Sequence, residues 1–205
     1  MVVKPIVLII LGLNIRNRNK LPADGPAIIA ANHNSHLDAL VLMSLYPLSQ
    51  IHKIRPVAAA DYFLSNRLLA WFSLDVIGII PLTRSGAVDK NSLFTECHQA
   101  LDHGEILLLF PEGSRGQPEQ LGEFKKGIFY LIQARQNTPV IPVVLHGLGR
   151  ALPRGEALLV PFNCDVIIGD ALSSKDYENA NLFINKLAVT YEELFEYCIT
   201  KNELE

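Results

Sequence analysis

Short apolar segments alternate with helix-periodic segments along most of this chain, which limits the folds open to it. Continuous apolar runs at 27–31 and 106–110 are typical of strands that are buried on both faces. Stretches such as 37–48 and 90–101 instead repeat apolar residues at helical spacing. This alternation predicts an α/β fold, a central and largely parallel mixed sheet flanked by helices. Further strands are expected at 56–60, 76–82, 139–145, 157–160 and 165–168, and further helices at 62–74 and 125–136.

The whole chain, residues 1–205, is expected to form a single domain, since no repeat or linker interrupts the alternation. Residues 1–21 combine an apolar run, too short to span a bilayer, with a basic stretch. Two interpretations of this segment are open: it faces an anionic membrane, or it is a first strand followed by a solvated loop. Residues 176–205 carry apolar side chains on one helical face and are expected to form a C-terminal docking helix.

Composition argues against some classes of function. The net charge of −3 is not that of a nucleic-acid binder, which normally carries a clear basic excess. Cys97, Cys164 and Cys198 have neither the spacing of a zinc site nor the pattern of a disulfide framework. This use of cysteine fits a reducing compartment.

The segment Asn32-His33-Asn34-Ser35-His36-Leu37-Asp38 lies where the predicted strand at 27–31 gives way to the helix at 37–48. At such a corner polar side chains meet the free N–H groups of a helix. From the first helical turn, Asp38 can accept a hydrogen bond from one ring nitrogen of His33, which leaves the other nitrogen able to take a proton. The pair is therefore a predicted general base with its orienting carboxylate.

Other interpretations of this segment stay open. Ser35-x-x-Asp38 is also a capping box, in which Asp38 only accepts a hydrogen bond from the Ser35 backbone N–H. His33, His36 and Asp38 could ligate zinc, although the other histidines form no second cluster. Ser35 as the nucleophile of an acyl-enzyme is disfavoured, because the chain contains no Gly-x-Ser-x-Gly elbow.

Two loops that follow predicted strands carry arginines. They are Gly78-x-x-Pro81-x-x-Arg84 and Phe110-Pro111-Glu112-Gly113-Ser114-Arg115, and Lys125 and Lys126 open the next helix. If the strands are parallel neighbours, the loops gather at one edge of the sheet, where α/β proteins bind ligands. Guanidinium groups beside lysines suit a phosphate, although each loop taken singly is typical of an ordinary turn.

Taken in order, these segments and Val140-Ile141-Pro142-Val143 resemble the four sequence blocks of the glycerolipid acyltransferase family, over about residues 22–172. Its members are lysophosphatidic acid and glycerol-3-phosphate acyltransferases. The resemblance implies transfer of a fatty acyl group to a glycerolipid hydroxyl, with His33 as the base and Asp38 as its orienting partner. The substrate-binding residues expected with it are Asn32, Ser35, Arg84, Glu112, Gly113, Ser114, Arg115 and Lys126.

The resemblance further implies an O-acyltransferase of phospholipid synthesis with acyl-CoA or acyl-carrier protein as the donor. No metal or other cofactor is expected, because a thioester is already activated. The expected acceptor is 1-acylglycerol-3-phosphate, with glycerol-3-phosphate or another lyso-lipid as the alternative and a non-catalytic lipid-binding protein as the rival of another class. The expected location is cytoplasmic, peripheral at the inner face of a membrane. Free N–H groups at the helix start after Ser35 are candidate donors to the oxyanion.

Overall fold

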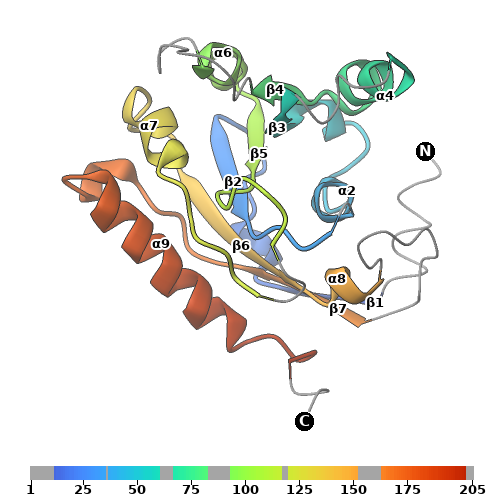
Figure 1. Cartoon of the computed structure of the whole chain (residues 1–205), viewed down its shortest axis with the longest axis vertical. Helices are drawn as coiled ribbons and strands as arrows, with labels where there is room; N and C mark the ends of the chain where they lie inside the picture. Colours follow the sequence, from blue (N-terminus) through green and yellow to red (C-terminus); the bar gives the residue numbers. More distant parts are fainter. Residues whose placement is uncertain are drawn as a thin grey trace.

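The computed structural model describes residues 12–35, 37–60, 67–82, 93–116, 120–151 and 163–201. Within these ranges seven strands form one sheet in the order β1-β7-β6-β2-β5-β3-β4 (Figure 1). The strands are β1 Gly12–Arg16, β2 Ala27–Ala31, β3 Ile54–Ala59, β4 Ile80–Leu82, β5 Ile106–Leu109, β6 Val140–His146 and β7 Asn163–Ile168. The α-helices are α2 Asp38–Ser44, α4 Arg67–Trp71, α6 Thr95–Asp102, α7 Gly127–Gln133, α8 Leu148–Ala151 and α9 Ala180–Phe195. Short 3₁₀ turns are η1 Arg18–Lys20, η2 Ile51–Lys53 and η4 Ser174–Asp176, and η3 Phe72–Ile77 is a π-helix.

Most of the sheet is parallel. Strands β2 to β6 run in one direction, whereas β7 is antiparallel to β6 and β1 is parallel to β7. At the centre, Ala30 of β2 pairs with Leu109 of β5 on one side and Pro142 of β6 on the other. Parallel neighbours must be joined by crossover connections, which the helices supply. The predicted α/β fold with a largely parallel mixed sheet is confirmed.

Helices cover both faces of the sheet (Figure 1). Alternate residues of β2 show the two layers: Ile28 and Ala30 pack with the core under α6, α7 and α9, while Ala27, Ile29 and Ala31 pack with the core under α2 and α8. All five side chains are fully buried. This two-sided burial is why the strand is a continuous apolar run instead of an alternating one.

The crossovers that follow β2 and β5 leave these neighbouring strands in opposite directions. The chain passes from β2 through α2 on one face toward β3, and from β5 through α7 on the other face toward β6. In doubly wound sheets ligands bind outside the carboxyl ends of strands at such a switch point. The residues that follow Ala31 and Leu109 therefore lie at the switch point, where a ligand is expected to bind.

The predicted C-terminal docking helix is observed as α9, which begins after an Asn179 cap whose side chain accepts a hydrogen bond from the Leu182 N–H. Its buried face packs on the sheet; the side chains in this face are Phe183, Leu187, Tyr191 and Leu194. The hydroxyl of Tyr191 donates to the carbonyl oxygen of Ala30 in β2 over 2.5 Å. Beyond the helix, Thr200 donates from its N–H (2.8 Å) and its hydroxyl (2.7 Å) to Asp165 of β7. The C-terminal segment is thus tied to two strands of the sheet.

Several predicted boundaries were wrong; the helix expected at 125–136, for example, ends at Gln133 in α7. The helix expected at 37–48 ends at Ser44, because Pro47 restricts the residue before it to non-helical conformations. The strand expected at 76–82 begins only at Ile80. Residues 76 and 77 belong instead to the π-helix η3, which is followed by Gly78 with a positive φ of 77°. The strand expected at 157–160 lies outside the described residues.

The N-terminal segment is described only from Gly12 onward, where β1 forms an edge strand that is parallel to β7. For residues 12–16 the structure therefore agrees with the strand interpretation. Across the part of the chain that is described, no helix has the length and apolar character needed to cross a membrane. All three cysteines are buried, and no two of them form a disulfide.

Candidate active site

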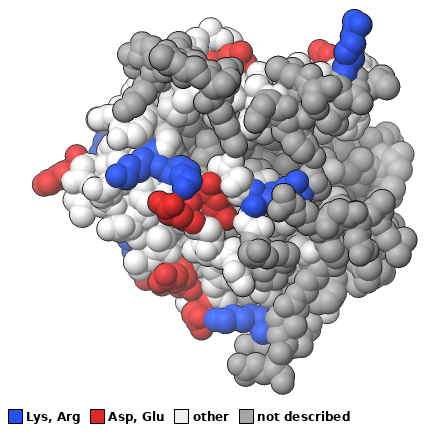
Figure 2. Space-filling view, in the orientation of Figure 1, with Lys and Arg blue, Asp and Glu red and all other residues white. Residues whose placement is uncertain are grey.

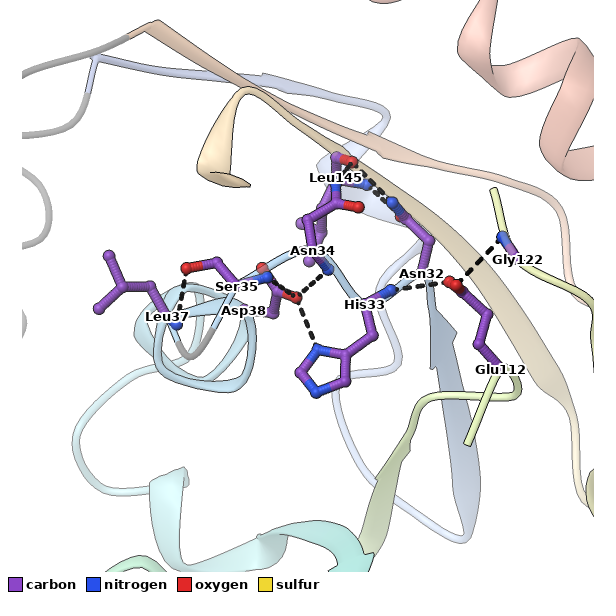
Figure 3. Close-up of polar contacts among 9 residues, drawn as sticks. All are labelled: Asn32, His33, Asn34, Ser35, Leu37, Asp38, Glu112, Gly122 and Leu145. Carbon is purple, nitrogen blue, oxygen red and sulfur yellow. Dashed lines mark hydrogen bonds and ion pairs between the residues drawn. The ribbon is translucent and has the colours of Figure 1, made fainter. Parts of the chain in front are cut away.

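His33 and Asp38 form a hydrogen-bonded pair beyond the carboxyl end of β2 (Figure 3). Nδ1 of His33 lies 2.8 Å from Oδ2 of Asp38. His33 stands two residues after the strand, and Asp38 is the first residue of α2, so the pair spans the turn between the two elements. The contact predicted from their spacing is confirmed.

Asp38 is fully buried, and its Oδ2 atom accepts every hydrogen bond that the carboxylate receives from described residues. Besides the His33 ring, the backbone N–H groups of Asn34 (2.7 Å) and Ser35 (2.8 Å) donate to Oδ2. The bond from Ser35 is the reciprocal half of a capping box, so the orienting pair and the cap coexist on one oxygen. Burial raises the pKa of Asp38 above its ordinary value, while the hydrogen bonds from His33, Ser35 and Asn34 oppose that rise.

The plane of the His33 ring is fixed by Phe110, the residue that follows β5. The two rings stack with centroids 4.1 Å apart and an interplanar angle of 18°. The imidazole is 22% exposed, and no described residue hydrogen-bonds to its Nε2 atom. With Asp38 ionised, Nδ1 carries the ring proton and Nε2 is the acceptor, which is the tautomer that a general base requires.

Glu112, predicted to bind substrate, has both carboxylate oxygens bonded to main-chain N–H groups. Oε1 accepts from His33 N over 2.9 Å, and Oε2 accepts from Gly122 N over 3.1 Å (Figure 3). The side chain is 4% exposed, and this burial raises the pKa of Glu112 above its ordinary value. The geometry therefore makes Glu112 a link between two segments of main chain and gives no support to a direct contact with substrate.

Asn32, another predicted substrate-binding residue, is likewise used inside the protein. Its Nδ2 donates to the carbonyl oxygen of Leu145 over 2.8 Å, and its Oδ1 accepts from the N–H of the same residue over 2.7 Å. Asn34 donates to the same carbonyl over 2.9 Å. The two asparagines thus join the corner after β2 to the neighbouring strand β6, and with 1% exposure Asn32 does not face a ligand.

At the helix start, where oxyanion donors were predicted, the N–H groups of Leu37 and Asp38 already have partners, as do those of Asn34 and Ser35 before them. The N–H groups of Asn34 and Ser35 bond to Asp38, the Leu37 N–H bonds to the Ser35 hydroxyl oxygen over 3.3 Å, and the Asp38 N–H bonds to the Ser35 carbonyl over 3.3 Å. Ser35 itself is 2% exposed. Its buried hydroxyl gives no support to a nucleophilic or substrate-binding role, and the corner N–H groups stabilise the corner itself.

The remaining predicted residues lie around the loop after β5. Gly113 adopts a positive φ of 74°, so its role is conformational: it permits the turn in which its N–H bonds to the Phe110 carbonyl. Ser114 is exposed, Arg115 is half-buried and Lys126 is exposed at the start of α7. Arg84 lies outside the described residues, so its predicted place beside Arg115 stays a prediction.

The zinc alternative receives no geometric support within the described ranges. There, no group of three or more histidine, cysteine or acidic side chains is placed to hold a metal ion. His36, the third member of the proposed set, lies outside those ranges.

Three contributors to the site were missed by sequence reasoning: Phe110, Asn34 and Gly122. An aromatic residue directly after a buried strand was a usable signal for Phe110, since ligands approach this edge of a sheet. Asn34 was visible as a polar residue of the corner. Nothing in the sequence around Gly122 indicates that its N–H bonds to a glutamate ten positions earlier.

Comparison with known proteins agrees with this fold. Residues 12–146 match the family model described as Acyltransferase. That match covers more than half of the chain, and the protein therefore belongs to this acyltransferase family, as the ordered motifs predicted. The chain is also similar to the crystal structure of the 1-acyl-sn-glycerophosphate acyltransferase PlsC from Thermotoga maritima, with a TM-score of 0.71 and 19% identity, covering 90% of this chain and 71% of that one.

Curated relatives are similar to this chain over most of its length. The chain is 32% identical over 158 residues to a chloroplastic 1-acyl-sn-glycerol-3-phosphate acyltransferase of Arabidopsis thaliana, covering 76% of this chain and 42% of the relative. It is 29% identical over 136 residues to the alpha form of 1-acyl-sn-glycerol-3-phosphate acyltransferase from Mus musculus, covering 65% of this chain and 45% of the relative. The chain thus spans less than half the length of these relatives.

Replacing Asp38 by asparagine separates its two structural roles. The amide oxygen can still accept from Asn34 and Ser35, so we expect a loss of stability within about 1–2 kcal/mol, the size of a cap. Any reaction that uses His33 as a base should slow by roughly 10³- to 10⁴-fold, because an amide does not stabilise the imidazolium. Denaturant unfolding and turnover give the two values. Asp102→Asn, in an exposed ion pair with Arg135, is the matched control. If activity falls only in proportion to stability, Asp38 is a cap alone.

Proposed function

We propose that this protein transfers a fatty acyl group from an acyl thioester to the hydroxyl of a lysophospholipid, with 1-acylglycerol-3-phosphate as the acceptor. The observation that carries the proposal is the 2.8 Å contact between His33 and Asp38 together with the open Nε2 atom. Membership of the acyltransferase family and the activities for which the relatives are named support the same reaction.

The proposed reaction begins when Nε2 of His33 takes the proton of the acceptor hydroxyl. The oxygen forms a bond to the thioester carbonyl carbon, and Asp38 stabilises the imidazolium through Nδ1. The carbon–sulfur bond then breaks, and the leaving thiolate receives the proton from Nε2, which restores the base. A thioester is already activated, so this sequence requires no metal ion and no covalent intermediate on the protein. The donor is acyl-CoA or an acyl-carrier protein.

The transfer assay tests this proposal directly. Purified protein with acyl-CoA and 1-acylglycerol-3-phosphate should release free CoA thiol and form diacylated product, detected by mass, with and without a chelator. His33→Ala should lower turnover by at least roughly 10²-fold, the lower end of what base catalysis contributes. His103→Ala, at an exposed histidine that ends α6, should retain normal turnover. Near-normal transfer by folded His33→Ala protein would contradict the mechanism.

We also propose that Arg115, with Arg84 and Lys126, binds the phosphate of the acceptor. Arg115→Ala removes charge-assisted hydrogen bonds of about 1.5–3 kcal/mol and should weaken acceptor binding roughly 10- to 150-fold. Arg115→Lys should restore binding only in part, since an ammonium lacks the planar fork. Kinetics with each substrate varied in turn give the measurement, and Arg135→Ala on the surface is the control. Equal losses for donor and acceptor would mean that Arg115 is structural.

The proposed substrates are amphiphiles, and the protein is proposed to act peripherally at a membrane surface, at the inner face. Three apolar side chains of α4 and η3 are exposed: Trp71 by 57%, Phe72 by 45% and Val76 by 56%. Together they form an apolar surface on one short segment. Tryptophan and phenylalanine favour the interface between water and lipid. Among the described residues of the face shown in Figure 2, basic side chains lie next to acidic ones.

Trp71 is the only tryptophan of the chain and therefore reports on its own surroundings. Adding anionic vesicles should shift its emission to shorter wavelength if this segment enters the lipid interface. Phe72→Ser with Val76→Ser should weaken vesicle co-sedimentation roughly tenfold or more, from the lost apolar burial. Tyr197→Ser, at a side chain that is 56% exposed elsewhere, is the control. Co-sedimentation without any emission shift would place the contact in another segment.

A further inference from the structure

We propose that Glu112 and Gly122 form a carboxylate clamp that positions His33, so that both are positioning residues for the proposed transfer reaction. The clamp consists of the Glu112 carboxylate and the two backbone N–H groups, of His33 and Gly122, that it accepts. The inference rests on the proposed function for its effect on rate, while the clamp itself is a feature of the fold.

The contacts that make up the clamp are close and sheltered from solvent. Glu112 accepts from His33 N over 2.9 Å with one oxygen and from Gly122 N over 3.1 Å with the other. These residues come from the turn after β2, the loop after β5 and the segment before α7. A carboxylate that is 4% exposed requires such donors, because a buried charge without them is costly. Because the N–H groups of His33 and Gly122 bond to the same carboxylate, moving either group shifts the carboxylate and disturbs its bond to the other.

At position 122, any side chain would collide with the Glu112 carboxylate unless that carboxylate moves away. A Cβ atom placed on Gly122 would lie 2.5 Å from Oε2 of Glu112 and 3.3 Å from its Cδ. That approach is shorter than any ordinary contact, so a side chain at position 122 would force the two groups apart. The glycine is thus explained by close main-chain approach to Glu112.

Further bonds carry the effect of the clamp to the base. The Gly116 N–H donates to the His33 carbonyl over 3.4 Å, and the Lys125 N–H donates to the Pro111 carbonyl over 2.8 Å. The loop that carries Arg115 is therefore bonded to His33 through Gly116, and its two ends are bonded to each other through Pro111 and Lys125. A shift of Glu112 would move the main chain of His33, and with it the ring that Asp38 and Phe110 hold in place. Small displacements of a reacting group cost rate steeply.

A direct role for Glu112 in acceptor binding makes a different prediction. Loss of such a contact would raise the acceptor KM with little change in kcat. Loss of positioning would instead lower kcat. The same fall in kcat is expected when the Glu112 carboxylate is left intact and only its partner at position 122 is changed. The variants Glu112→Gln and Gly122→Ala distinguish the two roles.

Each of these variants is expected to lower kcat roughly 10- to 100-fold, with the acceptor KM changed less than about threefold. In Glu112→Gln the NH2 group would face a backbone N–H, so one of the two bonds is lost. The double variant should be no more than about threefold slower than the slower single variant, because both changes break the same clamp. Gly127→Ala is the matched control: its added Cβ meets only Phe94, at 3.9 Å, and turnover should stay within about twofold.

Amide hydrogen exchange of the whole chain by NMR tests the clamp without any substrate. Exchange at His33 N should accelerate in both Glu112→Gln and Gly122→Ala, while core amides of β2 keep their protection. An unchanged His33 amide, fully additive losses in kcat, or a raised acceptor KM with normal kcat would each overturn the proposal. If the wild-type protein transfers no acyl group, the proposed function fails, and the exchange experiment still decides whether the clamp exists.

Discussion

The buried carboxylate of Asp38 is the interaction on which the corner after β2 depends. A charge removed from water is costly unless donors surround it, and here one oxygen receives the His33 ring and two backbone N–H groups. Satisfying that oxygen forces the chain to turn back on itself between strand and helix. The shape of the corner, the start of α2 and the orientation of the imidazole are therefore consequences of one buried charge.

Two other buried polar side chains near this edge of the sheet, Glu112 and Asn32, also bond to main-chain groups. Glu112 after β5 accepts main-chain N–H groups from two other segments, and Asn32 after β2 pairs with both backbone groups of Leu145 in β6. Motif side chains at this edge thus bond mainly to the main chain of adjacent elements. Such bonds fix the reacting groups before any substrate arrives, which is the condition for an efficient catalytic site. Of the pair His33 and Asp38, they leave the Nε2 atom of His33 open to a reactant.

Sequence reasoning predicted the parts of this architecture that are local. Two-sided apolar runs gave the strands, and the spacing from His33 to Asp38 predicted a contact within one turn. It did not predict main-chain partners that are distant in sequence: Asn32 bonds to a residue 113 positions away, and one partner of Glu112 depends on the path of a loop. A polar residue in a motif was therefore interpreted as a substrate ligand when its real partner is the main chain. At the helix start after Ser35, the N–H groups of Leu37 and Asp38 were likewise assumed free, whereas both bond to Ser35.

The site also depends on segments beyond the residues that match the family model, 12–146. Tyr191 of α9 donates to the carbonyl of Ala30, two residues before Asn32, and packs edge-on against Phe124, two residues after Gly122. Helix α9 therefore contacts both the strand that delivers His33 and the segment that bonds to Glu112. After helix α9, Thr200 bonds the C-terminal segment to Asp165, which is fully buried in β7. The motifs supply the reacting groups, but the C-terminal helix supplies part of the packing that holds their backbone in register.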